Sequence, residues 1–165
     1  MSKIHWLGAG LSAIPGLKML IENDHSVIVY NRTVKKASDA LLGVKGNYQI
    51  VEFSLEAIKK NATAGDVIVS MLPGNFHVPV AELSLSLGAH FVSSSYISDE
   101  MKMLHEESLK KNLCLVNEVG LDPGIDHSMS HALVEDYKNS KVFSAENNHC
   151  FLSYCGGLSD LPNDF

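Results

Sequence analysis

The sequence predicts an α/β protein with a doubly wound parallel sheet, and three observations carry this expectation. A short apolar strand at residues 3–7 runs directly into the glycine-rich turn Gly8-Ala9-Gly10-Leu11-Ser12-Ala13. Segments typical of strands then alternate with segments typical of helices along most of the chain. The run 66–72 is almost entirely apolar, which is typical of a parallel strand that helices cover on both faces. Together these features indicate a Rossmann-type sheet.

The glycine-rich turn has the composition of a pyrophosphate site. Gly8 permits a tight turn, Gly10 lets the backbone approach a phosphate, and Ala13 keeps the next helix close to the strand. The free N–H groups at the start of that helix would face the phosphates. The residues expected to contact a dinucleotide here are Gly8, Gly10, Leu11 and Ser12. A plain strand-to-helix turn is the alternative.

The end of the second strand indicates which dinucleotide is bound. Residues 26–30 are rich in β-formers and lead into Asn31-Arg32-Thr33, about 20 residues after the glycine turn, where the adenosine ribose is recognised. An acidic residue here would bind a ribose hydroxyl, whereas Arg32 offers a charged planar fork to a 2′-phosphate. We therefore expect NADP as the cofactor, with NAD possible, and contacts from Asn31, Arg32 and Thr33. Alternatively, Arg32 with Lys35 and Lys36 forms only a solvated helix start.

The remaining elements follow the same alternation. We expect helices over residues 35–42, 55–60, 78–87 and 125–137, and strands over residues 48–51, 66–72, 90–93 and 113–117. Gly88 should end one helix and Ser98 should cap another. Ligands of open α/β sheets bind beyond the carboxyl ends of the strands. Leu72 and Pro73, in the loop after the fourth strand, are therefore expected at the cofactor.

Composition excludes several classes of partner. The chain has 165 residues, 45% of them hydrophobic, and a net charge of −6 with a pI near 5.7. This charge argues against a nucleic-acid partner, and no apolar run is long enough for a membrane span or signal peptide. Three cysteines without C-x-x-C spacing fit a reducing compartment, so we expect a cytoplasmic protein. His127 and His131 lack a third ligand at recognisable spacing, so no metal is expected.

The end of the chain departs from the alternation of strands and helices. Residues 148–155 are expected to form another strand, but no covering helix follows them. We therefore divide the chain into a nucleotide-binding domain, residues 1–139, and the truncated beginning of a second, substrate-binding domain, residues 140–165.

Five segments resemble one family. They are residues 8–15, Phe76-His77, residues 94–98, residues 117–127 and residues 153–158, and the loop 120–127 is the most specific. From residue 3 to about residue 158 the chain resembles saccharopine dehydrogenase of the glutamate-forming type. That family's enzymes are longer, with a substrate domain after the nucleotide domain, through which a homodimer is possible.

The resemblance implies an NAD(P)-dependent oxidoreductase of lysine metabolism that acts on a CH–NH donor. Oxidation of saccharopine, a small amino-acid substrate, gives an imine, which water splits into glutamate and aminoadipate semialdehyde; the reverse is reductive condensation. By position in the family's motifs, Ser95 and Tyr96 would touch the substrate, and Asp122 would lie where substrate and nicotinamide meet. The residues that would border the cofactor are Ser153, Tyr154, Cys155 and Gly156. This chain alone is expected to be inactive.

Chemistry alone suggests further roles and leaves alternatives open. Asp122 could orient the amine, and His77 or His127 could relay a proton near neutral pH. Asp122 could equally be a turn residue before Pro123, His77 could cap the next helix, and His127 could pack inside its helix. A carboxynorspermidine or homospermidine synthase-like enzyme, or an NADP-binding domain without catalysis, are the alternatives for the whole chain.

Overall fold

The computed structural model describes residues 2–154 and contains a six-stranded sheet. Every pairing between neighbouring strands is parallel, and the strand order is β3-β2-β1-β4-β5-β6. This order reverses between β1 and β4, which is the topological switch point of a Rossmann sheet. The predicted fold class is confirmed. The strands are β1 (Ile4–Leu7), β2 (Val27–Asn31), β3 (Tyr48–Glu52), β4 (Val67–Ser70), β5 (His90–Ser93) and β6 (Leu115–Val116).

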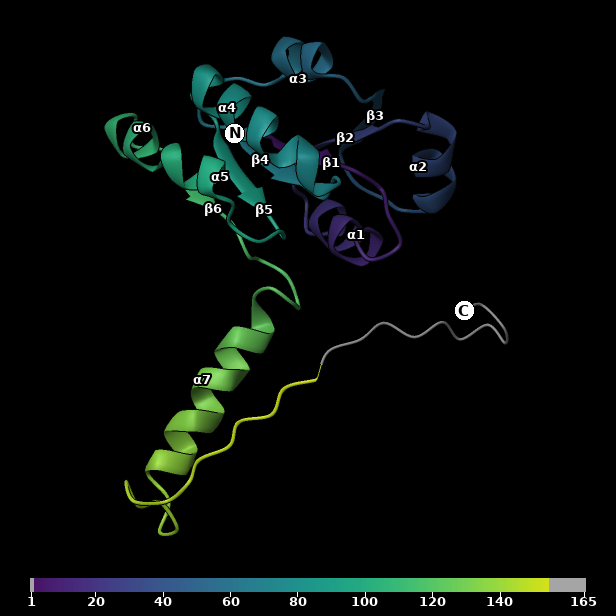
Figure 1. Ribbon diagram of the computed structural model, residues 1–165. Coiled ribbons are helices and arrows are strands. Elements are labelled where there is room, and N and C mark those ends of the chain that lie inside the picture. Colours follow the sequence, from purple (N-terminus) through teal and green to yellow (C-terminus); the bar gives the residue numbers. More distant parts are fainter. Residues whose placement is uncertain (1, 155–165) are drawn as a thin grey trace.

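Helices cover both faces of the sheet, because each parallel crossover returns over one face (Figure 1). Their ends carry both predicted signals, since Ser98 accepts a hydrogen bond from the Met101 N–H and Gly88 ends α4 in the left-handed conformation. Pro15 lies in the first turn of α1. The helices are α1 (Ile14–Glu22), α2 (Val34–Ala40), α3 (Leu55–Asn61), α4 (His77–Leu87), α5 (Asp99–Met103), α6 (His105–Lys110) and α7 (Ile125–Lys138), with a 3₁₀ turn, η1 (Gly74–Phe76), before α4.

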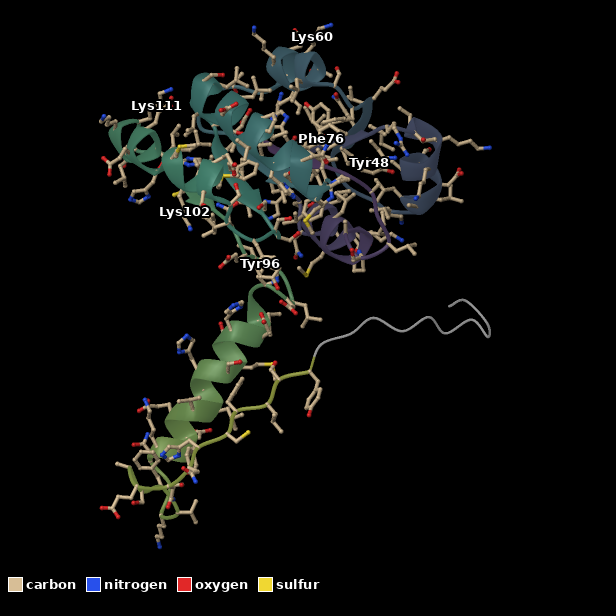
Figure 2. The ribbon with its side chains drawn as sticks, in the orientation of Figure 1. Tyr48, Lys60, Phe76, Tyr96, Lys102 and Lys111 are labelled. Carbon is tan, nitrogen blue, oxygen red and sulfur yellow. The ribbon has the colours of Figure 1, made fainter. Side chains whose placement is uncertain are left out.

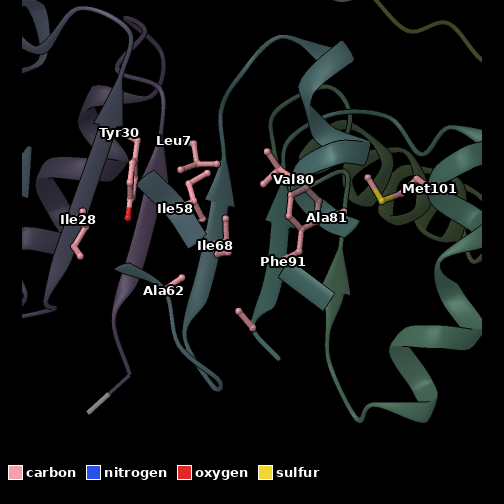
Figure 3. Packing of buried hydrophobic residues seen from close by; sticks show 11 residues of the cluster. Leu7, Ile28, Tyr30, Ile58, Ala62, Ile68, Val80, Ala81, Phe91 and Met101 are labelled. Carbon is pink, nitrogen blue, oxygen red and sulfur yellow. The ribbon is translucent and has the colours of Figure 1, made fainter. Parts of the chain in front are cut away.

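The core consists of two apolar layers, one on each side of the sheet. Successive strand residues point to opposite faces, so in β1 Trp6 packs with α1 and α2 while Leu7 packs on the other side. On that second side Ile68, Val80 and Phe91 join β4, α4 and β5 (Figure 3). Burial on both faces explains why these strands are almost continuously apolar.

Two predicted strands are shorter than expected. The run 66–72 forms a strand only over Val67–Ser70, because Met71 and Leu72 already belong to the loop that borders a cavity. The run 113–117 pairs over Leu115–Val116 alone, at the edge of the sheet.

The prediction of a strand at residues 148–155 is wrong for residues 148–154, which the structure describes. Residues 148–154 form no strand and are exposed. They run back beside α7, where His149 contacts Tyr137 and Phe143, rather than beside a strand (Figure 1). An apolar segment needs a neighbouring strand to satisfy its backbone groups, and none lies next to this one in the described part of the chain. Cys155 lies outside the described residues.

α7 extends away from the sheet (Figure 1), and none of its residues is buried. No helix within residues 2–154 is both long and apolar enough to cross a membrane.

Candidate functional site

The loops after β1, β2, β3 and β4 border one cavity of about 310 Å³ at the carboxyl edge of the sheet. The position agrees with the rule for open α/β sheets, since the cavity opens where the strand order reverses. The residues that line it are Gly8, Ala9, Gly10, Asn31, Arg32, Thr33, Lys36, Phe53, Met71, Leu72, Pro73 and Phe76. Seven of these twelve were predicted as cofactor contacts, namely Gly8, Gly10, Asn31, Arg32, Thr33, Leu72 and Pro73.

The glycine turn is held between two neighbouring strands. The Gly8 N–H donates to the Tyr30 carbonyl at 2.8 Å, and a Cβ on Gly8 would lie 2.8 Å from the Met71 carbonyl oxygen. Gly8 also has φ +99°, so its place requires glycine both for conformation and for space. Around Gly10 no heavy atom lies within 4 Å of an added Cβ, which leaves this backbone open to a ligand.

Two other predicted contacts of the turn lie outside the cavity wall. Leu11 is 91% exposed and Ser12 is also exposed, and neither lines the cavity. Both residues lie between Gly10 and the start of α1 at Ile14, in a part of the turn that no longer borders the cavity.

Asn31 has a structural task that the sequence did not reveal. Its Oδ1 accepts a hydrogen bond from the Ala9 N–H at 3.1 Å, and its Nδ2 donates to the Thr33 carbonyl at 2.8 Å. The side chain therefore ties the glycine turn to the loop after β2. That tie sets Arg32 and Lys36 beside the turn, where two cations border the same cavity.

Phe53 and Phe76 form an aromatic part of the cavity wall, and neither was among the predicted cofactor contacts. Their rings pack edge to face with centroids 5.7 Å apart, and Phe76 lies on the turn before α4 (Figure 2). Phe53 follows β3 directly, so the same rule that pointed to the loops after β1, β2 and β4 would have found it. An aromatic wall of this kind suits a flat heterocycle.

These residues fit NADP. The open Gly10 backbone suits a pyrophosphate, and Arg32 with Lys36 supplies charge for a 2′-phosphate. No acidic side chain borders this cavity among the described residues.

A second group of loops, after β5 and β6, continues the pairing of these strands. The Ser93 hydroxyl donates to Asn117 Oδ1 at 2.9 Å, and the Val119 N–H donates to the Ser93 carbonyl at 3.2 Å. The Glu118 N–H donates to the Ser95 carbonyl at 3.1 Å. Several backbone and side-chain bonds thus fix the two loops against each other, beyond the last strand residues.

Tyr96 and Asp122 meet across these two loops. The Tyr96 hydroxyl donates to Asp122 Oδ1 at 2.5 Å, and both side chains are exposed. Tyr96 lies between the sheet and the start of α7 (Figure 2). The structure therefore brings together two of the three residues that the family's motifs assign to the substrate.

The turn that follows Asp122 is supported by another aspartate. Asp126 Oδ1 accepts from the Gly124 N–H at 2.8 Å, and the Gly120 N–H donates to the Pro123 carbonyl at 3.0 Å. Hydrogen bonds from the Gly124 backbone and from His127 lower the pKa of Asp126, although desolvation acts the other way. Because Asp126 supports the turn, the Asp122 carboxylate is free to bond to Tyr96, and it is exposed to solvent.

His77 does not cap its helix. It is the first residue of α4 and is buried, with Nδ1 3.0 Å from Ser70 Oγ and Nε2 2.7 Å from Ser95 Oγ. Burial lowers the pKa of His77, against a smaller effect of the Leu72 carbonyl. The capping alternative is wrong, because both ring nitrogens are directed to serine hydroxyls on other elements.

His127 is exposed on α7, and its Nδ1 lies 2.9 Å from Asp126 Oδ1. The alternative that it packs inside the helix is therefore wrong. Within residues 2–154, no three His, Cys, Asp or Glu side chains are grouped so that they could hold a metal ion.

The tail residues do not reach the cofactor cavity. Ser153 and Tyr154 are exposed and do not line it. Cys155 and Gly156 lie outside the described residues.

The fold and the site define a dinucleotide-binding Rossmann domain. The sequence model described as the saccharopine dehydrogenase NADP binding domain matches residues 4–116, which is more than half of the chain. The chain belongs to this family, and its cofactor is NADP.

Two curated proteins show how similar this chain is to its relatives. An alpha-aminoadipic semialdehyde synthase of Arabidopsis thaliana is 36% identical over 142 residues, which cover 83% of this chain and 13% of that protein. The NADP⁺-dependent, L-glutamate-forming saccharopine dehydrogenase of Saccharomyces cerevisiae is 36% identical over 166 residues, or 96% of this chain and 35% of that protein.

A solved structure of the yeast enzyme, described as the apo, L-Glu-forming saccharopine dehydrogenase, superposes with a TM-score of 0.71 at 28% identity. The match covers 83% of this chain and 31% of the yeast chain. The chain thus spans about a third, or less, of the length of these relatives.

Proposed function

We propose that the chain is the NADP-binding domain of an NADP-dependent saccharopine dehydrogenase of lysine metabolism. The proposed reaction converts saccharopine, NADP⁺ and water to L-glutamate, aminoadipate semialdehyde, NADPH and a proton, or runs in reverse. The observation that carries the proposal is the Tyr96–Asp122 pair, which lies on the loops after β5 and β6 at the same edge of the sheet as the NADP cavity. The relatives named above support it.

Asp122 has the chemistry that the hydride transfer to NADP⁺ requires. NADP⁺, when bound, accepts a hydride from the carbon next to the secondary amine. Asp122 accepts from Tyr96 through Oδ1, and its second carboxylate oxygen can accept from the amine of the substrate. A carboxylate there stabilises positive charge on that nitrogen as the carbon is oxidised.

Ser95 and Tyr96 would hold the polar groups of the amino-acid substrate beside Asp122. His127, paired with Asp126 at the start of α7, is the candidate to exchange a proton with water during hydrolysis of the imine. Ser153, Tyr154, Cys155 and Gly156 stay predictions as cofactor contacts. The domain boundary between residues 139 and 140, a homodimer and a cytoplasmic location also stay predictions.

The test is an assay of the full-length protein that carries this chain. We expect NADPH formation that depends on saccharopine, with glutamate as a product. Turnover of carboxynorspermidine or of homospermidine, and not of saccharopine, would favour a synthase of that class. Tight NADP binding without turnover of any of these substrates would favour the alternative that the chain is a non-catalytic NADP-binding domain.

A further inference from the structure

Three hydrogen-bonded side chains run from the core of the sheet to the loop of the proposed substrate site. Ser70 is the last residue of β4 and is fully buried, His77 begins α4, and Ser95 is half-buried in the loop after β5. The His77 ring bridges the two serines, with Nδ1 3.0 Å from Ser70 Oγ and Nε2 2.7 Å from Ser95 Oγ. Three separate elements therefore meet through one imidazole.

The ring is well suited to act as a rigid spacer. A buried polar side chain is costly unless its polar atoms are bonded, and both ring nitrogens of His77 are. Burial lowers the pKa of this imidazole, which keeps it neutral in the neutral pH range. A neutral ring held at both nitrogens has no position open to solvent for proton exchange.

Ser95 is fixed on two sides. Its hydroxyl contacts His77, and its backbone carbonyl accepts from the Glu118 N–H at 3.1 Å. The next residue is Tyr96, whose hydroxyl bonds to Asp122. Whatever holds Ser95 therefore also sets the start of the loop from which Tyr96 reaches Asp122.

We propose that His77 is a positioning residue, which anchors Ser95 to the sheet through Ser70 and thereby aligns the Ser95–Tyr96 loop for the amino-acid substrate. His77 touches neither substrate nor cofactor in this arrangement, in contrast to the proton relay expected from sequence. The proposal rests on the proposed function, because the aligned loop is that of the saccharopine site.

A double-mutant cycle in the full-length protein tests the proposal. His77→Asn should raise KM for saccharopine about five- to tenfold, the effect of one lost hydrogen bond, with KM for NADP⁺ unchanged. Ser95→Ala should raise KM for saccharopine at least as much, because it also removes a hydroxyl that would contact the substrate. If His77 acts only through Ser95, the double variant should be no worse than Ser95→Ala. His90→Asn is the matched control, since His90 lies at the amino end of β5, where Nδ1 accepts from the Cys114 N–H.

Effects that multiply in the double variant would overturn the proposal, as would a rise in KM for NADP⁺ alone. Ser70→Ala keeps the imidazole and removes its anchor, so it provides the same test if His77→Asn does not fold. It should raise KM for saccharopine less than His77→Asn does.

Nitrogen NMR of the imidazole separates this proposal from the assignment of function. In Ser95→Ala the Nε2 resonance of His77 should shift while Nδ1 stays, and Ser70→Ala should do the reverse. Unchanged resonances in both variants would refute the hydrogen-bonded chain. An inactive wild-type protein with these shifts would refute the saccharopine assignment and leave the anchoring of Ser95 standing.

Discussion

Arg32 is the only arginine of the chain and borders the cavity beside the glycine turn. A guanidinium at this position would form a charge-assisted bond with a 2′-phosphate, which NADP carries and NAD lacks. We expect at least about tenfold tighter binding of NADP(H) than of NAD(H), and Arg32→Asp should reverse the preference. Titration of the purified protein with both cofactors measures the ratio.

The matched control for this charge reversal is Lys60→Asp. Lys60 lies on α3, and its exposed side chain does not border the cavity (Figure 2). Lys60→Asp should keep the wild-type preference. Equal affinity of the wild-type protein for the two cofactors would contradict the role of Arg32.

Asp122 is the residue on which the proposed chemistry depends most. Asp122→Asn removes the negative charge next to the amine but keeps an oxygen that can accept from Tyr96. In the active full-length protein, kcat should therefore fall by about a hundredfold or more while Kd for NADP(H) stays within about twofold. Steady-state kinetics and cofactor titration measure both quantities.

Asp136→Asn, an exposed change on α7, is the control and should leave kcat and the melting temperature unchanged. A purely structural Asp122 would behave differently. In that case Asp122→Asn would lower the melting temperature, while kcat per folded molecule would stay at the wild-type value.

Among the elements, β1, β2 and β4 are joined on one face by a buried polar network. His5 Nδ1 lies 2.9 Å from the Tyr30 hydroxyl, and His5 Nε2 lies 3.1 Å from Asp66 Oδ2. Burial lowers the pKa of His5 despite the carboxylate of Asp66, and burial raises the pKa of Tyr30 to about 12. Asp66 also accepts from the N–H groups of Lys3 and Thr63, and together these bonds lower its pKa although desolvation opposes them.

This network predicts that the protein loses stability below about pH 6.5. The unfolded chain takes up a proton on His5 near its ordinary pKa of about 6.5, whereas the folded protein, with a lowered pKa, does not. The free energy of unfolding should therefore fall as the pH drops from 7.5 to 5.5. The lowered pKa of Asp66 adds a further loss only below about pH 4, where the unfolded carboxyl becomes protonated.

Melting curves at pH 5.5, 6.5 and 7.5 test this dependence. His5→Asn should lower the melting temperature and make it depend less on pH. Part of the pH dependence should remain in this variant, because burial also lowers the pKa of His77. His25→Asn, at an exposed site before β2, should keep the wild-type slope. A flat profile in the wild-type protein would contradict the burial argument.

At the scale of the whole molecule, the cofactor side of the site is more complete than the substrate side. Loops within residues 2–154 line the NADP cavity on several sides, whereas Tyr96 is 63% exposed and Asp122 is also exposed. Ile125, Met129 and Leu133 recur every fourth residue along α7 and are more than half exposed, so one face of this helix has no apolar cover in the described structure.

We therefore predict that the 165-residue chain by itself binds NADP(H) but does not oxidise saccharopine. Cofactor binding needs only the cavity that these loops line, whereas turnover needs the substrate held against Tyr96 and Asp122 and shielded from water. Quenching of protein fluorescence by NADPH and a saccharopine-dependent NADPH assay on the same sample measure the two properties. Steady NADPH production by this chain alone would show that the exposed site is sufficient.

Sequence patterns predicted most of the cofactor site because that site follows from local rules. Gly8 and Gly10 follow β1, and Arg32 follows β2, so the carboxyl-end rule places them together as soon as the strands are recognised. Phe53 directly follows β3 and obeys the same rule. Leu11 and Ser12 were predicted as cofactor contacts from their positions in the glycine motif. The structure places both outside the cavity wall.

The sequence by itself determined the alternation of strands and helices, the helix ends at Ser98 and Gly88, and the positive charge of Arg32 at the end of β2. These features depend on residues within a few positions of one another, where backbone and side-chain chemistry acts directly. The tertiary structure alone decided that His77 bridges two serines, that Tyr96 meets Asp122, and that residues 148–154 form no strand. Each of these depends on segments that are far apart in the chain or on whether a neighbouring strand is present, and no local pattern encodes such contacts.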